Sequence, residues 1–172
     1  GILHRDLKPA NVLMSDYGEP ALTDFGIASI TTGDATLTAT HAFTISHAPP
    51  EVLEGAGATV LSDVYSLGST LWTLLTGRPP FSVEGEDGLI QRALRVQQQP
   101  LPPTGRDDVP DVLEATLARA MAKAPDERYP TAAALGLALQ AVQHRLGQPE
   151  TPLRVGKADP DEVTVPPGSD DA

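Results

Sequence analysis

The most hydrophobic helical pattern in the chain runs over residues 62–77. Apolar or small residues stand at positions 64, 65, 67, 68, 71, 72, 74 and 75. At about 3.6 residues per turn they cover well over half of a helix circumference, which is typical of a buried helix. Ser62 is a favourable N-cap and Asp63 an acid in the first turn, while Gly77 and the prolines after it end the helix.

Three further segments show the helical spacing of apolar residues. The first is residues 87–98, the second begins at Pro110 and the third is capped by Thr131 and stopped by Gly147. Their predicted inward residues are Leu89, Ile90, Ala93 and Leu94, then Leu113, Leu117, Ala120 and Met121, then Leu135, Ala138, Leu139, Val142 and Leu146.

Two short apolar runs near the N-terminus predict a β-hairpin. Residues 11–14 and 21–23 flank a turn-rich segment over residues 15–20. Because a hairpin brings its two outer ends together, we expect Asn11 and Asp24 at the same open end.

Two segments lack any regular period. Residues 27–50 are rich in Thr, Ala and Ser, and a loop of this length within a compact domain is usually functional or mobile. From residue 148 onward, prolines alternate with acids, Gly and Ser, which is typical of a disordered segment or linker. We therefore expect one domain over residues 1–147 and an acidic Pro-rich tail or linker over residues 148–172.

Composition narrows the range of partners. The chain has 172 residues, a net charge of −11 and no cysteine. This charge disfavours nucleic acid and anionic membranes, and no apolar run approaches a membrane-spanning length. The N-terminus lacks the features of a signal peptide, and we expect a cytoplasmic protein, with membrane anchoring of the parent protein through a segment beyond the tail as the alternative. The chain also begins without Met and inside a motif, which suggests a fragment.

The polar loop over residues 4–11 carries the candidate chemistry, and apolar runs flank it on both sides. The Asp6 carboxylate can accept a proton from a hydroxyl, and the Lys8 ammonium can stabilise negative charge nearby. Asn11 and Asp24 can together offer an amide and a carboxylate oxygen to Mg²⁺, which takes few protein ligands beside waters and phosphates.

These motifs resemble those of Hanks-type (eukaryotic-like) serine/threonine protein kinases of bacteria. Residues 4–11 match the catalytic loop H-R-D-L-x-x-x-N, and residues 24–26 spell D-F-G. Residues 63–68 are similar to the start of the central kinase helix, and residues 124–130 resemble a D-P-x-x-R stretch. The resemblance extends to about residue 146.

The resemblance implies an α+β fold of the type of a kinase C-terminal lobe. Such a lobe is mainly α-helical, with a short β-hairpin that carries the metal site. The N-terminal lobe is absent from this sequence, since nothing matches its Gly-rich loop, strand lysine or helix glutamate. We therefore expect the isolated chain to bind ATP weakly or not at all.

The resemblance also implies roles for individual residues. Asp6 orients the hydroxyl and accepts its proton, Lys8 stabilises the transferred charge, and Thr44 lies beside both. Asn11 and Asp24 hold Mg²⁺ (or Mn²⁺), and Lys8, Asn11, Leu13 and Asp24 contact ATP, with Leu13 under the adenine. The expected structural residues are His4, Phe25, Gly26, Asp63, which anchors the catalytic loop, and Glu51 paired with Arg128.

Residues 27–50 then correspond to the activation segment. Thr36, Thr38 and Thr40 are the candidate regulatory phosphosites, and Arg5 is the residue that would pair with a phosphate there. Phe43, His47 and Pro49 depart from the usual family residues, which leaves peptide specificity open.

The function implied is ATP-dependent phosphoryl transfer to Ser and Thr hydroxyls of proteins, with a kinase dimer as a partner for autophosphorylation. The alternative is a catalytically inactive, truncated or pseudokinase-like module that binds proteins. A purely structural helical domain explains neither the loop at residues 4–11 nor the D-F-G hairpin.

Overall fold

The computed structural model of the protein describes residues 2–25, 45–83 and 88–153. Five predicted site residues, Gly26, Thr36, Thr38, Thr40 and Thr44, lie outside these ranges. In chain order the elements are the 3₁₀ helix η1 (Pro9–Asn11), strands β1 (Val12–Met14) and β2 (Pro20–Leu22), helices α2 (Pro50–Leu53), α3 (Val60–Thr76), α4 (Leu89–Gln98) and α5 (Asp111–Ala120), the 3₁₀ helix η2 (Pro125–Glu127) and helix α6 (Ala132–Arg145).

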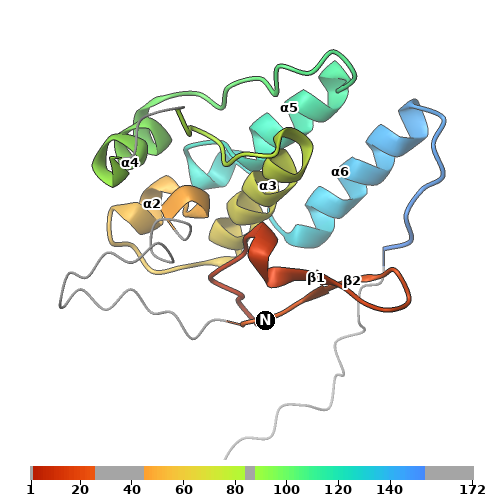
Figure 1. The fold of residues 1–172 in the computed structure, drawn as a ribbon, viewed down its shortest axis with the longest axis horizontal. Helices are drawn as coiled ribbons and strands as arrows, with labels where there is room; N and C mark the ends of the chain where they lie inside the picture. The colour runs from red at the N-terminus through yellow and green to blue at the C-terminus, as the bar shows by residue number, and fades with distance from the viewer. Residues whose placement is uncertain (1, 26–44, 84–87, 154–172) are drawn as a thin grey trace, which may run out of the picture.

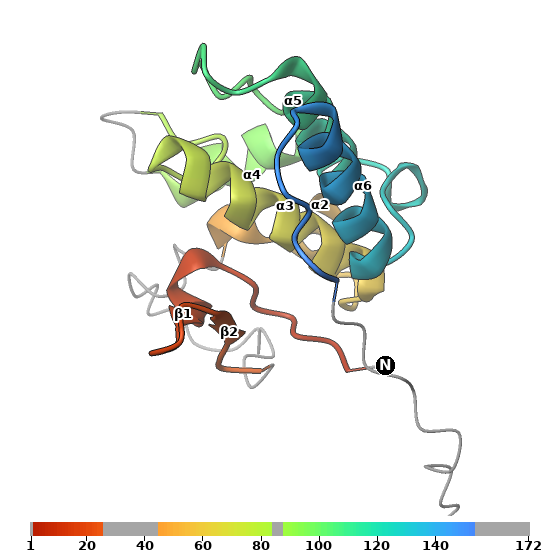
Figure 2. The ribbon, with the colours of Figure 1, turned by 90° about the vertical axis from the view of Figure 1, so that its right-hand side faces the viewer.

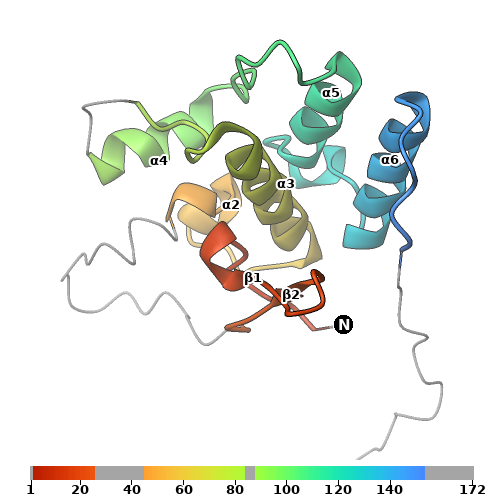
Figure 3. The same cartoon turned by 45° about the vertical axis from the view of Figure 1, so that its right-hand side comes forward.

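Helix α3 lies at the centre of the fold (Figure 1). Helices α5 and α6 pack on one side of it, and α2 and α4 pack against each other on the other side (Figure 3). The hairpin lies beyond η1, which contacts α3 directly. The described residues therefore form a mainly helical unit with one small antiparallel sheet, as the sequence predicts.

Two hydrophobic clusters pack against α3, because successive residues of a helix point in different directions. Val64 packs with Ala120, Tyr129 and Leu135 of the α5–α6 side. Tyr65, the next residue, packs with Phe81, Val96 and Met121 on the α4 side. A single helix thus holds both halves of the core together.

The start of α3 differs from the prediction. Thr59, not Ser62, is the N-cap, and the helix begins at Val60. The Ser62 N–H donates to the Thr59 hydroxyl at 3.3 Å, and the Thr59 N–H donates to the Ser62 hydroxyl at 3.1 Å. This reciprocal capping box satisfies two amides that would otherwise lack partners. The end agrees with the prediction, since Gly77 has a left-handed φ of 76°.

Burial also departs from the apolar pattern in places. On α3, Leu74 is 62% exposed, whereas the polar residues Ser66, Ser69 and Thr70 are buried. On α4, the predicted inward residue Ile90 is 75% exposed, and Val96 is the buried residue. Among the described residues, helix α4 contributes to the core through Val96, near its C-terminal end, and Ile90 in its first turn lies outside the core clusters.

The hairpin has the predicted antiparallel form. Val12 pairs with Leu22 and Met14 with Pro20, and the turn contains Gly18 at a left-handed φ of 75°. The Thr23 N–H donates to the Asn11 carbonyl at 3.0 Å, which extends the pairing by one step. Asn11 and the residues that follow β2 consequently lie at the same end of the hairpin.

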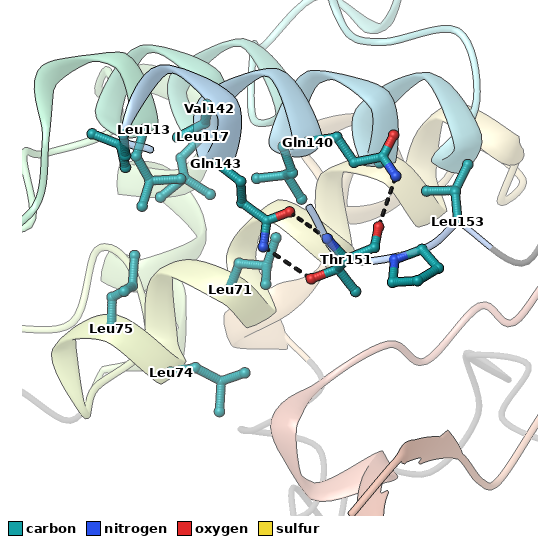
Figure 4. Close-up of a pocket in the computed structure, with 14 residues that line it drawn as sticks. Leu71, Leu74, Leu75, Leu113, Leu117, Gln140, Val142, Gln143, Thr151 and Leu153 are labelled. Carbon is teal, nitrogen blue, oxygen red and sulfur yellow. Dashed lines mark hydrogen bonds between the residues drawn. The ribbon is translucent and has the colours of Figure 1, made fainter. Parts of the chain in front are cut away.

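An apolar groove of about 490 Å³ runs between α3, α5 and α6 (Figure 4). Residues 149–153 follow α6 and lie along it (Figure 2), and Thr151, Pro152 and Leu153 form one wall of the groove. The Thr151 N–H donates to the Gln143 side chain at 2.9 Å, and the Gln140 amide donates to the Thr151 carbonyl at 2.7 Å.

None of the helices that the structure describes is both long and apolar enough to cross a membrane.

Two glycines of the helices give a matched test of the packing. A Cβ on Gly68 would lie 2.9 Å from Met121 Cγ and 3.0 Å from Ala120 Cβ, inside the contact of α3 with α5. We expect Gly68→Ala to lower the free energy of unfolding of the complete protein by roughly 1–3 kcal/mol, because overpacked cores are strained.

The control is Gly136→Ala on α6, where the new Cβ would meet only the flexible end of Leu153. Here the gain in helix propensity, about 0.5–1 kcal/mol, is expected to offset the displacement of Leu153. Chemical denaturation of both variants measures the difference. Equal effects of the two substitutions would contradict a close α3–α5 contact at Gly68.

Candidate active site

The centre of the candidate site is a hydrogen-bonded cluster of Asp6, Lys8 and Asn11. Lys8 Nζ lies 2.8 Å from Asp6 Oδ2, and the two side chains are only 10% and 14% exposed. The Asn11 Nδ2 amide donates to the same Oδ2 at 3.1 Å and to the Asp6 backbone carbonyl at 2.8 Å. One oxygen of the carboxylate is therefore held by a cation and an amide.

The side-chain orientation of Asn11 follows from these bonds. A carbonyl oxygen only accepts hydrogen bonds, so the atom that faces the Asp6 carbonyl must be the Asn11 amide nitrogen. The side chain is 4% exposed and leaves η1, whose first residue is Pro9. The Asn11 Oδ1 makes no hydrogen bond to the described residues and keeps its lone pairs for another ligand.

Asp24 lies just after β2, at the end of the hairpin where Asn11 lies. Its backbone has a left-handed φ of 58°, an unusual conformation for a residue with a side chain, and the residue is exposed. No group of three or more His, Cys, Asp and Glu residues forms a metal cluster among the described residues. An amide and a carboxylate oxygen fit Mg²⁺, which binds few protein ligands, better than a cation that needs a full protein cage.

Asp63 at the start of α3 holds the backbone of the catalytic loop, residues 4–11. Its Oδ2 accepts the His4 N–H at 2.7 Å and its Oδ1 accepts the Arg5 N–H at 2.9 Å. Arg5 has a left-handed φ of 69°, a conformation that costs free energy and persists only where the surroundings impose it. The two bonds to one carboxylate supply that restraint and turn the loop toward Asp6.

His4 connects the catalytic loop to the end of β2. Its ring is buried, and Nε2 lies 2.9 Å from the Thr23 carbonyl, so Nε2 carries the hydrogen of this bond. The ring also lies 4.7 Å from that of Phe25 between centroids. Phe25 itself is 52% exposed.

The structure brings Glu51 and Arg128 together as a bidentate pair with N–O distances of 2.7 and 2.8 Å. The Arg128 side chain is fully buried, and it also donates to the carbonyls of Leu61, Ala122 and Lys123. Burial raises the pKa of Glu51, but the hydrogen bonds from Arg128 and Ser62 outweigh it, so the net pKa is lowered. This pair joins α2 to the segment before α6.

His47 lies buried beside the catalytic cluster. Its Nδ1 is 2.7 Å from the Ser69 hydroxyl, and its carbonyl accepts the Ser66 hydroxyl at 2.9 Å. Burial and, next, the charge of Lys8 lower the pKa of His47 to about 4, although Asp6 acts in the opposite direction. The imidazole is therefore neutral near pH 7.

The remaining predicted residues lie at the surface of the described part. Leu13 on β1 is 53% exposed, and Arg5 is exposed as well. Both side chains are thus accessible to a partner on the hairpin side of the chain.

Four residues with clear roles in the site escaped the sequence analysis. The Thr23 carbonyl accepts a hydrogen bond from the His4 ring, and the Ser62 hydroxyl donates to the Glu51 carboxylate at 3.1 Å. The Ser66 hydroxyl bonds to the His47 carbonyl, and the Ser69 hydroxyl bonds to the His47 ring. The serines did carry a signal, because hydroxyls three or four residues apart on a buried helix need polar partners. Thr23 acts through its backbone, which the side-chain pattern does not reveal.

Comparison with known proteins identifies the family of the chain. The family model for the protein kinase domain matches residues 1–145. The chain is 47% identical to serine/threonine-protein kinase PknK of Mycobacterium tuberculosis over 86% of its own length and 13% of that protein. It is 38% identical to serine/threonine-protein kinase PknB of Mycolicibacterium smegmatis over 100% of its own length and 28% of that protein.

The chain therefore belongs to the protein kinase family and is similar to bacterial serine/threonine kinases of the Hanks type. It spans between 13% and 28% of the length of these two relatives.

Asp63→Ala tests the anchor of the catalytic loop. Removal of two hydrogen bonds to a charged group should lower the free energy of unfolding by about 3 kcal/mol. The amides of His4 and Arg5 should exchange with solvent faster, as hydrogen–deuterium exchange of the loop peptide can measure. Asp111→Ala, at the exposed start of α5, is the control and should cost only about 0.3–1 kcal/mol. Unchanged exchange in Asp63→Ala would contradict the anchoring role.

The buried imidazole of His47 predicts a pH dependence of stability. Between pH 6.5 and about 4 the unfolded chain binds a proton at this residue that the folded chain does not. Stability should therefore rise with pH across this window and fall as pH is lowered, by roughly 3 kcal/mol in total.

Unfolding measured at pH 7 and pH 4.5 checks this expectation. His47→Gln should lose much less stability between these two pH values than the wild type. His144→Gln, at a histidine that is 79% exposed, is the matched control and should behave like the wild type. The same loss in all three proteins would show that His47 does not titrate in this window.

Proposed function

We propose that the complete protein transfers the γ-phosphoryl group of ATP to serine and threonine hydroxyls of other proteins. The observation that carries the proposal is the cluster at Asp6, where the proposed base, a cation and an amide meet within hydrogen-bonding distance. The similarity to named serine/threonine kinases supports the same reaction class.

In this mechanism Asp6 acts as the base. The hydroxyl oxygen of the substrate forms a bond to the γ-phosphorus while its proton passes to the Asp6 carboxylate. The bond between the γ-phosphorus and the bridging oxygen breaks, and ADP leaves. Lys8, held at 2.8 Å from Asp6, lies where it can stabilise negative charge on the transferred group.

Asn11 Oδ1 and the Asp24 carboxylate would hold Mg²⁺ (or Mn²⁺), which neutralises charge on the phosphates when bound. The exposed side chain of Leu13 is available to contact the adenine. We assign Thr44 a place beside Asp6 and Lys8 by family resemblance alone, since it lies outside the described residues.

Regulation is part of the same proposal. Thr36, Thr38 and Thr40 would be phosphorylated by a second copy of the kinase. Arg5, whose side chain is exposed, would then pair with the phosphate. We further propose that the part of the protein represented by this chain acts in the cytoplasm on protein substrates.

A non-catalytic, pseudokinase-like binding module is the second candidate. A decayed site would be expected to lose its base, its cation or one of its metal ligands. Asp6, Lys8, Asn11 and Asp24 are all retained, so catalysis is the better-supported function.

Asp6→Asn in the complete protein tests the catalytic role. The amide cannot accept the hydroxyl proton, so phosphoryl transfer should fall by about 10²–10⁴-fold, as radiolabelled phosphate incorporation would measure. ATP affinity should stay within about threefold, because Asn11 and Asp24 are unchanged. Asp16→Asn, in the exposed hairpin turn, is the matched control. Full turnover by Asp6→Asn would refute the assigned role.

A further inference from the structure

The chain turns back on itself after α6. Gly147 has a left-handed φ of 65°, and the segment that follows runs along the helix toward its start, where Leu153 lies against Gly136. Pro149 and Pro152 disfavour helix in this segment, because each ring removes a backbone N–H and restricts the residue before it. Residues 149–153 accordingly form neither helix nor strand.

Thr151 fixes this segment to α6 (Figure 4). Its N–H donates to Gln143 Oε1 at 2.9 Å, and its hydroxyl accepts from Gln143 Nε2 at 2.9 Å. Its carbonyl accepts from Gln140 Nε2 at 2.7 Å. The two glutamines lie three residues apart and therefore share one face of the helix. Three hydrogen bonds thus converge on one threonine.

The Thr151 hydroxyl is accessible to chemistry. The residue is exposed, and its hydroxyl hydrogen has no acceptor among the described residues. The three bonds join neutral groups at the surface, and such bonds contribute little net free energy, so the segment can leave the helix. Pro152 also biases Thr151 toward an extended backbone, which presents the hydroxyl to another protein more readily than a helix does.

A phosphoryl group on this hydroxyl would oppose the docked arrangement. It adds nearly two negative charges where Gln143 offers only a neutral amide, in the last turn of α6 and thus near the negative end of the helix dipole. The neighbouring Glu150 is acidic and already pairs with His144 at 3.0 Å. Arg145 lies two residues from Gln143, and residues at this spacing do not face each other on a helix.

The position of Thr151 favours modification by another copy of the protein. Four residues beyond Gly147 reach at most about 14 Å. Helix α6 has 14 residues and is about 21 Å long, and η1 and the hairpin lie toward its other end (Figure 1). The hydroxyl therefore does not reach Asp6 of its own chain while α6 is folded.

We propose that Thr151 is a phosphorylation site, modified by a second copy of the complete kinase, and that the phosphate releases residues 149–153 from α6. Thr151 Oγ1 forms a bond to the γ-phosphorus of ATP, the bond to the bridging oxygen breaks and ADP leaves. The hydroxyl proton passes to Asp6 of the second copy. Release removes one wall of the apolar groove. The inference rests on the proposed kinase function and adds the chain itself as a substrate.

The site is tested on the complete protein with ATP and Mg²⁺, by mass spectrometry of the peptide that contains residue 151. We expect phosphate on Thr151, at an initial rate that rises with the square of the protein concentration. Asp6→Asn should remain essentially unmodified alone and acquire the phosphate when it is mixed with the wild type. An initial rate proportional to the protein concentration would overturn transfer between copies.

Gln143→Ala tests the attachment of the segment. It removes two of the three bonds, so the segment should detach more often and Thr151 should be phosphorylated about threefold faster or more. Gln98→Ala, at an exposed glutamine of α4, is the matched control and should keep the wild-type rate. Equal rates in both variants would overturn the role of Gln143.

The release is tested by hydrogen–deuterium exchange of residues 149–153. Thr151→Glu and Thr151→Gln have similar size and differ in charge, and the Glu variant should exchange about threefold faster or more. Phosphorylated wild type should likewise exchange faster than the unmodified protein. Equal exchange within both pairs would overturn release by the phosphate.

The two levels of the proposal fail in different ways. If the complete protein phosphorylates no protein with ATP and Mg²⁺, the kinase function itself is wrong. If it phosphorylates other proteins, or other residues of its own chain, but not Thr151, the kinase function stands and the modification site alone is wrong.

Discussion

The geometry of the candidate site depends on one carboxylate, that of Asp63. It accepts the amides of two successive residues, His4 and Arg5, that lie 59 and 58 positions away in the chain. These bonds impose a left-handed backbone at Arg5 and set the direction of the loop toward Asp6. Without this restraint, the loop would exchange among conformations in which Asp6, Lys8 and Asn11 do not meet, because Arg5 would relax to a more common backbone conformation.

Helix α3 extends this support along its whole length. At its start Ser62 donates to Glu51, in its middle Ser66 and Ser69 hold His47, and near its end Thr73 lines a small cavity beside Lys8. The helix therefore contributes to the hydrophobic core and also supplies hydrogen bonds that position residues of the candidate site. Its buried serine and threonine hydroxyls have partners and add orientation to the site, whereas the buried Tyr65 hydroxyl has none among the described residues.

Much of this arrangement could be predicted from local patterns. The hairpin, the stop at Gly77 and the cap at Thr131 follow from turn and capping chemistry that acts within a few residues. The N-cap of α3 was misplaced because Thr59 and Ser62 cap one another and both are suitable residues. The predicted inward face of α4 was wrong, because burial on this helix depends on where it meets the core. Val96 lies at that contact and is buried, whereas Ile90 lies away from it and is exposed.

The sequence by itself determined the residues of the site and their order along the chain, because catalytic groups, turns and caps are encoded within short segments. Local patterns could not determine which distant polar groups meet. The pair of Glu51 and Arg128, which spans 77 positions, was expected from the family resemblance alone, and the contact of His47 with Ser69, which spans 22, was not expected. Such contacts form only when α3 is packed between its neighbours. The tertiary structure alone therefore decided that His47 is buried and neutral and that a cavity lined by neutral side chains and Lys8 opens beside it.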